Sequence, residues 1–371
     1  MNQHAHITGW GMAVPEKILT NDEIAETVDT TDEWIVSRTG IHERRIASPH
    51  ESTASLASDA ALKALEVASL SPYDVDLIIV ATSSPEHLFP STASLVQDRI
   101  GAIKAGAFDL SAACTGFIFG LNMASQAIQT RSIDTAIVVG AETLSRLVNW
   151  KDRNTCILFG DGAGAFVLQA SEDPGGLLSA VMRSDGSGGD LLILPAGGSK
   201  LPTSQETILN GQHYVQMNGR EVFRFATQVM AGATREVINK AQLKMRDIRL
   251  VIPHQANQRI IEAAARGLKL PLDRFAINLD RFGNTSTASI PMATVEAIQD
   301  QRLKPGDKIV FVGFGGGLTW GAAAVQWTGP LPERKQVWPY RFQHLYSLWV
   351  KIRSLILRID RRIEGWIWGR R

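Results

Sequence analysis

An internal repeat constrains the fold of this chain more than any other feature of its sequence. Residues 68–79 match residues 241–252 in an alanine, two leucines, an aspartate and several aliphatic positions, and the same offset aligns residues 137–140 with 310–313. A constant offset across separated segments is hard to obtain by chance. We therefore expect two similar halves that meet near residue 175, where a Pro-Gly-Gly sequence interrupts the pattern.

Strand and helix patterns alternate through both halves. Helical patterns such as residues 52–68 and 222–242 precede short aliphatic runs. These runs lie at residues 76–82, 135–141, 249–252 and 308–312. Continuous apolar strands of this kind are typical of sheets that helices cover on both faces. The sequence predicts an α/β fold with an N-terminal half at residues 1–174, a C-terminal half at 175–330 and a separate extension at 331–371.

The composition favours a large intracellular protein with an unusual C-terminus. With 371 residues, 44% of them hydrophobic, the chain can bury a sizeable core, and its two cysteines are too few for a disulfide framework. No apolar signal core follows Met1, so we expect the reducing cytoplasm. The formal net charge of +1 is unevenly distributed, because residues 331–371 contain ten Lys or Arg against three Asp or Glu, a balance of +7.

Cys114 is the candidate nucleophile. It lies where an apolar run at residues 107–110 changes to small residues, ahead of a helical pattern at 117–128. Backbone N–H groups at the start of a helix lower the pKa of a thiol and make it a better nucleophile. The alternative is a small, buried and inert thiol, which is the commoner role of a single free cysteine. Two later segments favour the catalytic interpretation.

Those two segments carry groups that can act together with a cysteine. His254 follows the apolar run at residues 249–252 after one proline, and open α/β sheets place their active sites at such strand ends. Asn284 falls in the loop that the repeat aligns with the Cys114 loop, so the duplication would bring both residues to one place. Taken alone, His254 could be a structural or surface histidine, and the Gly-Asn pair at Asn284 a simple turn.

Several other conspicuous residues have structural interpretations. Ser111, Thr115 and Ser286 fit small-residue packing, and Cys156 lies in an aliphatic run typical of a core. The eight histidines show no metal-ligand spacing, so we expect no metal site. The glycine-rich residues 313–317 lack the Lys-Ser/Thr of a phosphate loop. We expect these glycines to let the backbone approach the catalytic centre closely.

Together these segments resemble the β-ketoacyl-acyl carrier protein synthase III family. The resemblance extends from about Ile7 to Trp327. The motifs that carry it are residues 29–41 (DTTDEWIVSRTGI), the Cys114 segment, 159–164 (FGDGAG), 253–257 (PHQAN), 283–286 (GNTS) and 314–321 (FGGGLTWG). It implies a thiolase-like α/β fold in which two duplicated halves form a layered α-β-α-β-α body, followed in this chain by a C-terminal amphipathic helix.

The resemblance also implies a reaction. Cys114, His254 and Asn284 would catalyse the decarboxylating condensation of an acyl-coenzyme A primer with malonyl-acyl carrier protein, which initiates fatty acid synthesis. Cys114 would hold the acyl group, and His254 and Asn284 would stabilise the enolate. Backbone N–H groups of Cys114 and of residues 315–317 would hold the oxyanion. No metal or cofactor is implied, because coenzyme A enters as part of the acyl-CoA substrate.

Further residues are implied at the coenzyme A entrance, the carrier protein surface and the acyl pocket. Trp34 would stack on the adenine, and Asn154 departs from the glycine of the family. The other coenzyme A-binding residues would be Thr30, Arg38, Arg153, Gly219, Phe223, Ala256 and Asn257. The residues that would meet the acidic carrier protein are Arg224, Arg259 and Arg266, which on charge alone fit a solvated helix face equally well. Phe89 would close the acyl pocket of the partner subunit in a homodimer.

Residues 331–371 extend beyond the usual end of the family and have a pattern of their own. Apolar residues recur at alternating spacings of four and three, with Lys and Arg off this stripe, which predicts an amphipathic helix with a basic face. The stripe comprises Trp338, Phe342, Leu345, Trp349, Ile352, Ile356, Ile359, Ile363 and Trp366. Charges interrupt it too often for a transmembrane span. The helix could anchor on an anionic membrane, which its Trp and Arg content favours, form a coiled coil, or fold onto its own body.

Three alternative functions compete with the condensation. A synthase III-like acyltransferase or condensing enzyme of a specialised metabolite pathway would also use Cys114. A 3-hydroxy-3-methylglutaryl-coenzyme A synthase would need a glutamate at the strand end where Thr82 and Ser83 stand, which argues against it. A non-enzymatic membrane scaffold would have no need of Cys114, His254 and Asn284 together.

Overall fold

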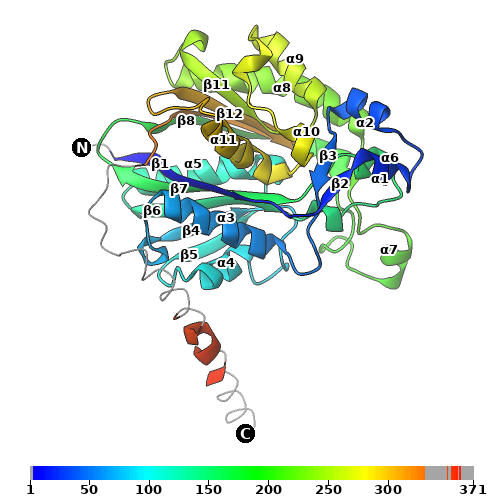
Figure 1. Cartoon of the computed structure of the whole chain (residues 1–371), viewed down its shortest axis with the longest axis horizontal. Helices are drawn as coiled ribbons and strands as arrows, with labels where there is room; N and C mark the ends of the chain where they lie inside the picture. Colours follow the sequence, from blue (N-terminus) through cyan, green and yellow to red (C-terminus); the bar gives the residue numbers. More distant parts are fainter. Residues whose placement is uncertain (1–2, 331–348, 350–351, 358, 361–371) are drawn as a thin grey trace.

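The computed structural model describes residues 3–330, together with residues 349, 352–357 and 359–360 of the C-terminal extension. Its body is built around two large sheets (Figure 1). The first has the order β1-β7-β6-β4-β5, with β1 (His4–Ala13), β7 (Gly162–Ser171), β6 (Thr135–Glu142), β4 (Leu77–Ala81) and β5 (Gly106–Leu110). The second has the order β11-β12-β13-β8, with β11 (Ile248–Pro253), β12 (Lys308–Gly315), β13 (Thr319–Gln326) and β8 (Gly176–Ser184).

Both large sheets follow one plan, as the sequence repeat predicts. In the first, β4 pairs in parallel with β6, β6 pairs antiparallel with β7, and β7 antiparallel with β1. In the second, β11, β12, β13 and β8 repeat these directions in the same order. The counterpart of β5 is reduced to a parallel bridge between Val251 and Phe275. The predicted division near residue 175 falls between β7 and β8, and the exact boundaries stay a prediction.

Helices form three layers around the two sheets (Figure 1). The central layer comprises α5 (Gly116–Gln129) and α11 (Ser289–Gln299). The outer layers comprise α3 (Thr53–Val67) and α4 (Thr92–Ile100) on the first sheet, and α8 (Gly219–Lys240) and α9 (Gln258–Leu268) on the second. The smaller elements are β2 (Ile18–Thr20), α1 (Asn21–Ala25), α2 (Asp32–Thr39), β3 (Glu43–Arg45), α6 (Arg153–Cys156), β9 (Leu192–Ile193), α7 (Gln205–Leu209), β10 (Gln216–Met217) and α10 (Leu279–Phe282). The predicted α-β-α-β-α architecture is therefore confirmed.

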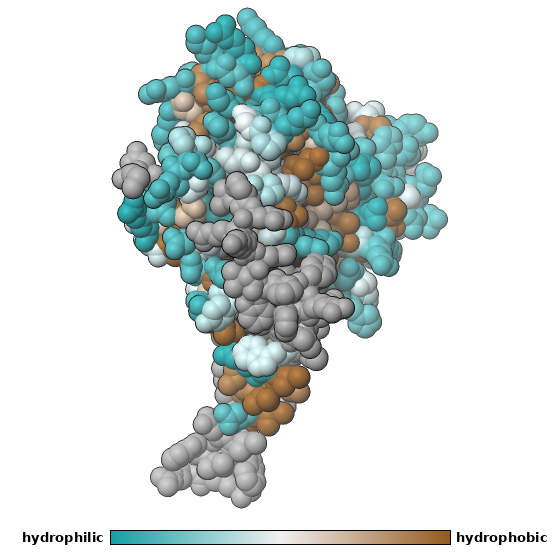
Figure 2. Space-filling view, turned by 60° about the vertical axis from the view of Figure 1, so that its left-hand side comes forward, coloured by the Kyte–Doolittle hydropathy of each residue, from teal (hydrophilic) through white to brown (hydrophobic). Residues whose placement is uncertain are grey.

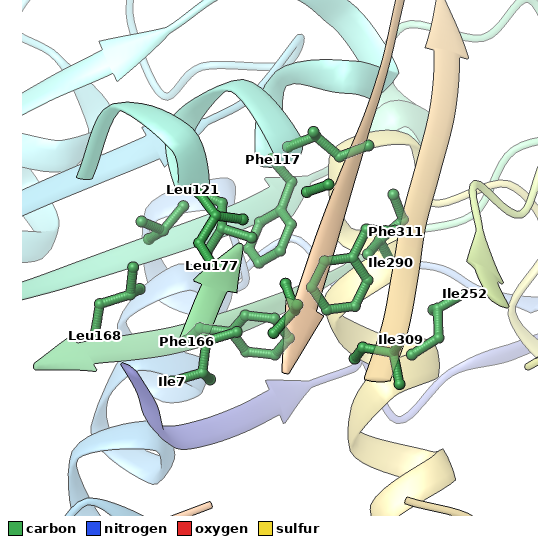
Figure 3. Packing of buried hydrophobic residues seen from close by; sticks show 14 of the residues in the cluster. Ile7, Phe117, Leu121, Phe166, Leu168, Leu177, Ile252, Ile290, Ile309 and Phe311 are labelled. Atoms are coloured by element: carbon green, nitrogen blue, oxygen red, sulfur yellow. The ribbon is translucent and has the colours of Figure 1, made fainter. Parts of the chain in front are cut away.

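The central helix α5 is held by aromatic packing between the two sheets. Phe117 at the start of α5 meets Phe166 of β7 with ring centroids 5.0 Å apart, and Phe166 meets Phe311 of β12 at 5.9 Å (Figure 3). All three side chains are fully buried. Edge-to-face and tilted aromatic pairs of this kind add to the gain from burial. The first turn of α5 is thereby fixed against both halves, and Cys114 lies directly before it.

The strand that leads to Cys114 is less buried than the sequence predicts. The apolar run at residues 107–110 indicates a buried strand, but β5 lies at the edge of its sheet and Phe108 is 36% exposed. An edge strand has a hydrogen-bonded neighbour on one side only, so part of its surface stays open in the single chain.

The described part of the C-terminal extension is α-helical and projects from the body (Figures 1 and 2). Four stripe residues belong to it, and 47–58% of each is exposed. These residues are Trp349, Ile352, Ile356 and Ile359. On another face, the Ser354 hydroxyl donates to Asp98 of α4 at 2.9 Å. The described part of the stripe is therefore half-exposed, and the other predicted members lie outside the described residues. Within the described residues, no helix is long and apolar enough to cross a membrane.

Candidate active site

Cys114 lies in a kinked turn at the start of the central helix α5. Ala113 has a φ of 47°, and a 3-10 helix, η2 (Ala113–Thr115), leads directly into α5. The cysteine is 7% exposed. Burial above all, together with the nearby Glu142 carboxylate, raises the pKa of the Cys114 thiol to about 12. The sequence-based expectation of a lowered pKa is therefore wrong for the resting site, because desolvation outweighs the helix terminus.

The second half places an equivalent turn beside the first. Ser286 also has a φ of 47°, and the 3-10 helix η7 (Ser286–Ala288) leads into α11. The Ser286 hydroxyl donates to Cys114 Sγ at 3.3 Å. The Ser286 N–H donates to Asn284 Oδ1 at 2.9 Å, which fixes the amide of Asn284 with its NH2 group on the other side. The duplication thus brings the Cys114 and Asn284 loops together, as the repeat predicts.

His254 is tied to the same turn through a second serine. Its Nδ1 lies 2.8 Å from the Ser289 hydroxyl, which donates to the carbonyl of Ser286 at 2.9 Å. The imidazole packs edge-on against Phe314, with ring centroids 5.3 Å apart. Burial lowers the pKa of His254 to about 3, so the ring is neutral near pH 7. A neutral imidazole can donate from one nitrogen only, and the Ser289 hydroxyl determines which.

Ser286 is one of two residues whose place in the site the sequence did not indicate. The sequence assigns it to small-residue packing, but its hydroxyl contacts Cys114, its N–H contacts Asn284, and its carbonyl leads to His254 through Ser289. A signal was available, since the repeat aligns Ser286 with Ala113, directly before the cysteine. Without the fold, packing is the simpler interpretation, because serine is common in tight turns.

The glycine-rich segment approaches Cys114 as the sequence predicts. A Cβ atom on Gly315 would lie 2.7 Å from the backbone nitrogen of Cys114, closer than packing allows. The hydroxyl of Thr319, on the following strand, donates to the carbonyl of Ala112 at 3.1 Å. These contacts hold the backbone of residues 315–317 against the Cys114 turn.

Glu142 is a second residue absent from the sequence-based site. It ends β6, is completely buried, and accepts hydrogen bonds from the loop that follows β4. The donors include the Ser84 hydroxyl at 2.6 Å and the Ser83 N–H at 3.0 Å. The sequence has no glutamate at the strand end where Thr82 and Ser83 stand. The neighbouring strand β6 nevertheless brings the carboxylate of Glu142 to that strand end. Burial raises the pKa of the Glu142 carboxyl, against the hydrogen bonds it accepts.

A cationic clamp at the surface joins three of the predicted coenzyme A-binding residues. The guanidinium of Arg153 lies 4.9 Å from the Trp34 ring centroid, and that of Arg38 lies 5.7 Å from it. Asn257 donates to the carbonyl of Arg38 at 2.9 Å. Asn154, which stands where the family has glycine, hydrogen-bonds to Asp152. Its side chain therefore does not displace Arg153 from the Trp34 ring. Two cations around one indole suit an anionic ligand with an aromatic group.

The remaining predicted residues are spread over nearby surfaces. Thr30 precedes α2, with its hydroxyl buried and without a hydrogen-bond partner. Gly219 begins α8, and Phe223 one turn later packs under the guanidinium of Arg259 at 5.3 Å. Ala256 lies half-buried two residues after His254.

The predicted carrier protein and acyl-pocket residues have few contacts in the single chain. Arg224 and Arg266 each pair with a glutamate on their own helix, Glu221 and Glu262, an arrangement typical of a solvated face. Phe89 is 86% exposed. Their roles stay predictions.

Two other sequence-based expectations concern cysteine and metal. Cys156 is fully buried and lies in a small apolar cluster with Ile157 and Phe159. Within the part of the chain that the structure describes, no group of three His, Cys, Asp or Glu side chains is placed to hold a metal ion.

Comparison with known proteins identifies the family. The family model described as 3-oxoacyl-[acyl-carrier-protein] synthase III matches residues 108–186, and its C-terminal counterpart matches 238–327. The β-ketoacyl-[acyl-carrier-protein] synthase III of Symbiobacterium thermophilum is 54% identical over 86% of this chain and 97% of its own length. This chain belongs to the β-ketoacyl-acyl carrier protein synthase III family. The predicted family and enzyme class, an acyltransferase-type condensing enzyme, are confirmed.

Solved structures of the family have the same fold. The crystal structure of 3-oxoacyl-[acyl-carrier-protein] synthase III from Aquifex aeolicus is 45% identical, has a TM-score of 0.81, and is matched over 87% of this chain and 100% of that one. The priming β-ketosynthase from the R1128 polyketide biosynthetic pathway is 32% identical, with a TM-score of 0.82 over 89% of this chain and 98% of that one. The predicted thiolase-like fold is thereby confirmed.

Proposed function

We propose that this protein condenses an acyl-coenzyme A primer with malonyl-acyl carrier protein, releasing carbon dioxide and forming 3-oxoacyl-acyl carrier protein at the start of fatty acid synthesis. The observation that carries the proposal is the convergence of Cys114, His254 and Asn284 on one residue, Ser286. The names of the relatives agree with this reaction. No bound cofactor is required, because coenzyme A arrives with the acyl group.

The first half-reaction is acyl transfer to Cys114. The sulfur attacks the thioester carbon, coenzyme A leaves, and an acyl-enzyme remains. The tetrahedral oxyanion needs preorganised donors, and the N–H of Cys114 together with the backbone of residues 315–317 lies beside the sulfur. Because the oxyanion donors are main-chain groups, acylation does not depend on the amide of Asn284.

The second half-reaction uses the His254 and Asn284 side. When malonyl-acyl carrier protein loses carbon dioxide, negative charge develops on its thioester oxygen. Asn284 can donate its NH2 group there. His254 can donate from Nε2 once the Ser289 hydroxyl turns from the carbonyl of Ser286 to donate to Nδ1. The resulting carbanion attacks acyl-Cys114 and releases the thiolate. A histidine that stays neutral suits this role, because it can donate a hydrogen bond to the enolate oxygen without acting as a base.

Substrate binding is assigned to two surfaces. The clamp of Trp34, Arg38 and Arg153 would take the nucleotide end of coenzyme A, with Thr30 beside it. The pantetheine arm would pass Gly219, Phe223, Ala256 and Asn257. The acidic carrier protein would dock on Arg224, Arg259 and Arg266 by charge complementarity.

We propose a homodimer with a shared acyl pocket. Leu88 and Phe89 are 82% and 86% exposed, an unusual state for adjacent large apolar side chains, and β5 offers an open sheet edge. In a dimer, Phe89 would limit the depth of the partner's acyl pocket and favour short primers.

The C-terminal extension is proposed as a contact with anionic membrane for an otherwise cytoplasmic enzyme. Its described helix exposes Trp349, Ile352 and Ile356 along one stripe, while basic residues such as Arg353 lie off that stripe. We expect full-length protein to float with vesicles containing anionic lipid, and a chain ending at Pro330 not to float. Full-length Ile352→Glu/Ile356→Glu should behave like the truncation. Equal flotation of all three, or none with any vesicle, rules the contact out.

One observation favours a second function. The R1128 synthase is a polyketide enzyme with the same fold, so a synthase III-like acyltransferase or condensing enzyme of a specialised pathway stays the alternative. Carbon dioxide release from malonyl-acyl carrier protein, measured with a panel of acyl-CoA primers, separates a condensing enzyme from a non-decarboxylating acyltransferase. Release that depends on a short primer supports the proposed condensation. Acyl transfer without carbon dioxide release indicates a non-decarboxylating acyltransferase. If the protein shows neither activity, the scaffold interpretation remains.

A further inference from the structure

Arg44 is a completely buried cation on β3. Burial above all lowers the pKa of its guanidinium to about 10, so the group is still charged near pH 7. None of the ion pairs among the described residues involves it. A buried charge without an opposite charge is costly unless several hydrogen bonds compensate for the lost water. The acceptors of those hydrogen bonds therefore show which segments the charge holds together.

The guanidinium of Arg44 joins two segments that are far apart in the sequence. Nη2 donates to the carbonyl of Ile157 at 2.7 Å, directly after α6, and Nη1 donates to Asn21 Oδ1 at 2.7 Å. The NH2 group of Asn21 in turn donates at 2.7 Å to Asp32, the first residue of α2. The planar fork of a guanidinium can hold two acceptors in fixed directions, which the single ammonium group of a lysine cannot. Arg44 thus fixes the carbonyl of Ile157 relative to α2 and β3.

The segment that begins at Ile157 holds the backbone of Asn284 on both sides. The N–H of Asn284 donates to the carbonyl of Leu158 at 2.8 Å, and the carbonyl of Asn284 accepts from the N–H of Gly160 at 3.1 Å. A Cβ atom on Gly160 would lie 3.1 Å from Arg44 Cβ, so β3 packs closely against this segment. On its other side β3 lies beside α10, the helix that leads to Asn284 (Figure 1). The position of Asn284 therefore depends on a segment that Arg44 holds.

We propose that Arg44 is a positioning residue for the condensation half-reaction. Its guanidinium holds the carbonyl of Ile157, residues 158–160 hold the backbone of Asn284, and the NH2 group of Asn284 is thereby kept where the enolate oxygen forms. Acyl transfer does not need this arrangement, because its oxyanion donors belong to the Cys114 turn and to residues 315–317. The hydrogen-bond acceptors of Arg44 among the described residues lie in neither of those segments. The inference rests on the proposed function, since it concerns the donor to that enolate.

Two substitutions of Arg44 test the proposal through the two half-reactions. Arg44→Lys keeps the charge but cannot hold both acceptors, and Arg44→Met removes the charge, and with it the cost of burying it, while keeping much of the volume. In a single turnover of enzyme acylated beforehand, carbon dioxide release from malonyl-acyl carrier protein should fall about tenfold in Arg44→Lys and about 10²-fold in Arg44→Met. Acylation of Cys114 at saturating acyl-CoA, read by intact mass, should stay within a few-fold of wild type and so also shows that each variant is folded.

A double variant separates positioning from a general structural role. If Arg44 acts through Asn284, Arg44→Lys should slow carbon dioxide release by less than about twofold when Asn284→Ala is already present. A merely structural role would slow acylation as well, and its effect would multiply with that of Asn284→Ala.

The neighbouring arginine of β3 provides the matched control. The side chain of Arg45 donates to the carbonyls of Pro15 and Glu16, at 3.4 and 3.3 Å, and not to the segment that holds Asn284. Arg45→Lys should therefore leave both half-reactions within about twofold of wild type.

Several results would overturn the role given to Arg44. They are wild-type carbon dioxide release in Arg44→Lys and Arg44→Met, a loss in Arg45→Lys as large as that in Arg44→Lys, a parallel loss of acylation, or effects of Arg44→Lys and Asn284→Ala that multiply. Wild-type protein that takes up the acyl group but releases no carbon dioxide would give a different pattern. That result would refute the proposed condensation itself, and the inference with it.

Discussion

The two active-site loops have the same backbone and different chemistry. Ala113 and Ser286 each have a φ of 47°, and each begins a 3-10 helix that leads into a central helix. They are 173 residues apart (286 − 113), the offset of the sequence repeat. In the first loop this turn holds the nucleophile Cys114, whereas in the second it holds the hydroxyl and amide groups that surround it. A duplicated turn thus supplies both members of one site.

The strand ends differ in the same complementary way. The end of β6 carries Glu142, and the matching end of β12 carries Gly315. Glu142 brings a carboxylate to the Ser286 turn, while Gly315 lets the backbone reach the Cys114 turn. Each half therefore contributes the group that the other half's loop lacks. The division predicts that the two half-reactions can be damaged separately.

The largest separation is expected from Asn284→Ala. This change removes a donor to the enolate but leaves the sulfur and the main-chain oxyanion donors in place. Carbon dioxide release should fall about 10²–10³-fold, while acylation of Cys114, read by intact mass, should stay within a few-fold of wild type. A parallel loss of both half-reactions would show that the two loops do not divide the chemistry.

The second test targets the approach of the glycine-rich backbone. In Gly315→Ala, the new Cβ would lie 2.7 Å from the Cys114 nitrogen, so the oxyanion donors must move and both half-reactions should fall by about 10². Gly313→Ala is the matched control, because its Cβ would meet His254 Cβ at an ordinary 3.5 Å. Equal behaviour of the two variants in stopped-flow acylation would contradict the role given to Gly315.

A smaller effect is expected from Ser289→Ala. Without the hydroxyl, Nδ1 of His254 loses the one group beside it that can donate to it and so keep the hydrogen on Nε2. Losing one such hydrogen bond should slow condensation by about tenfold, with acylation unchanged. Ser289→Thr keeps the hydroxyl and should recover most of the rate. If Ser289→Thr does not recover the rate, or if acylation slows as much as condensation, His254 does not act as the hydrogen-bond donor.

The smallest effect is expected at the entrance, outside both loops. Trp34→Ala removes the ring between Arg38 and Arg153, so KM for acyl-CoA should rise about fivefold, with kcat unchanged. The KM for an acyl-pantetheine substrate, which lacks the nucleotide, should not change. A rise in both KM values would show that Trp34 supports the fold of the site rather than binding the nucleotide.

Much of the fold was predictable because its signals are repeated and local. The alignment of residues 68–79 with 241–252 predicted two matching sheets, and the aliphatic runs predicted their buried strands. The burial of β5 was predicted wrongly, because an apolar run cannot show whether a strand has neighbours on both sides. Motifs also led to Cys114, His254 and Asn284, which the structure brings together.

Ser286 and Glu142 escaped the sequence because their roles depend on three-dimensional contacts. Serine in a tight turn and glutamate at a strand end are ordinary in isolation. Only the folded chain places one turn against both Cys114 and Glu142, through Ser286 and Thr287 respectively. The thiol pKa was misjudged for the same reason, since burial at a junction of two halves is a tertiary property.

The most direct test of the account is the intact mass of the protein after incubation with a panel of acyl-CoA thioesters, with Cys114→Ala alongside. We expect the wild type alone to gain the mass of one acyl group per chain, and the preferred acyl group to identify the primer. An equal gain on Cys114→Ala, or no gain on the wild type with any thioester, would contradict the assignment of Cys114 as the acyl acceptor in a site built from both halves.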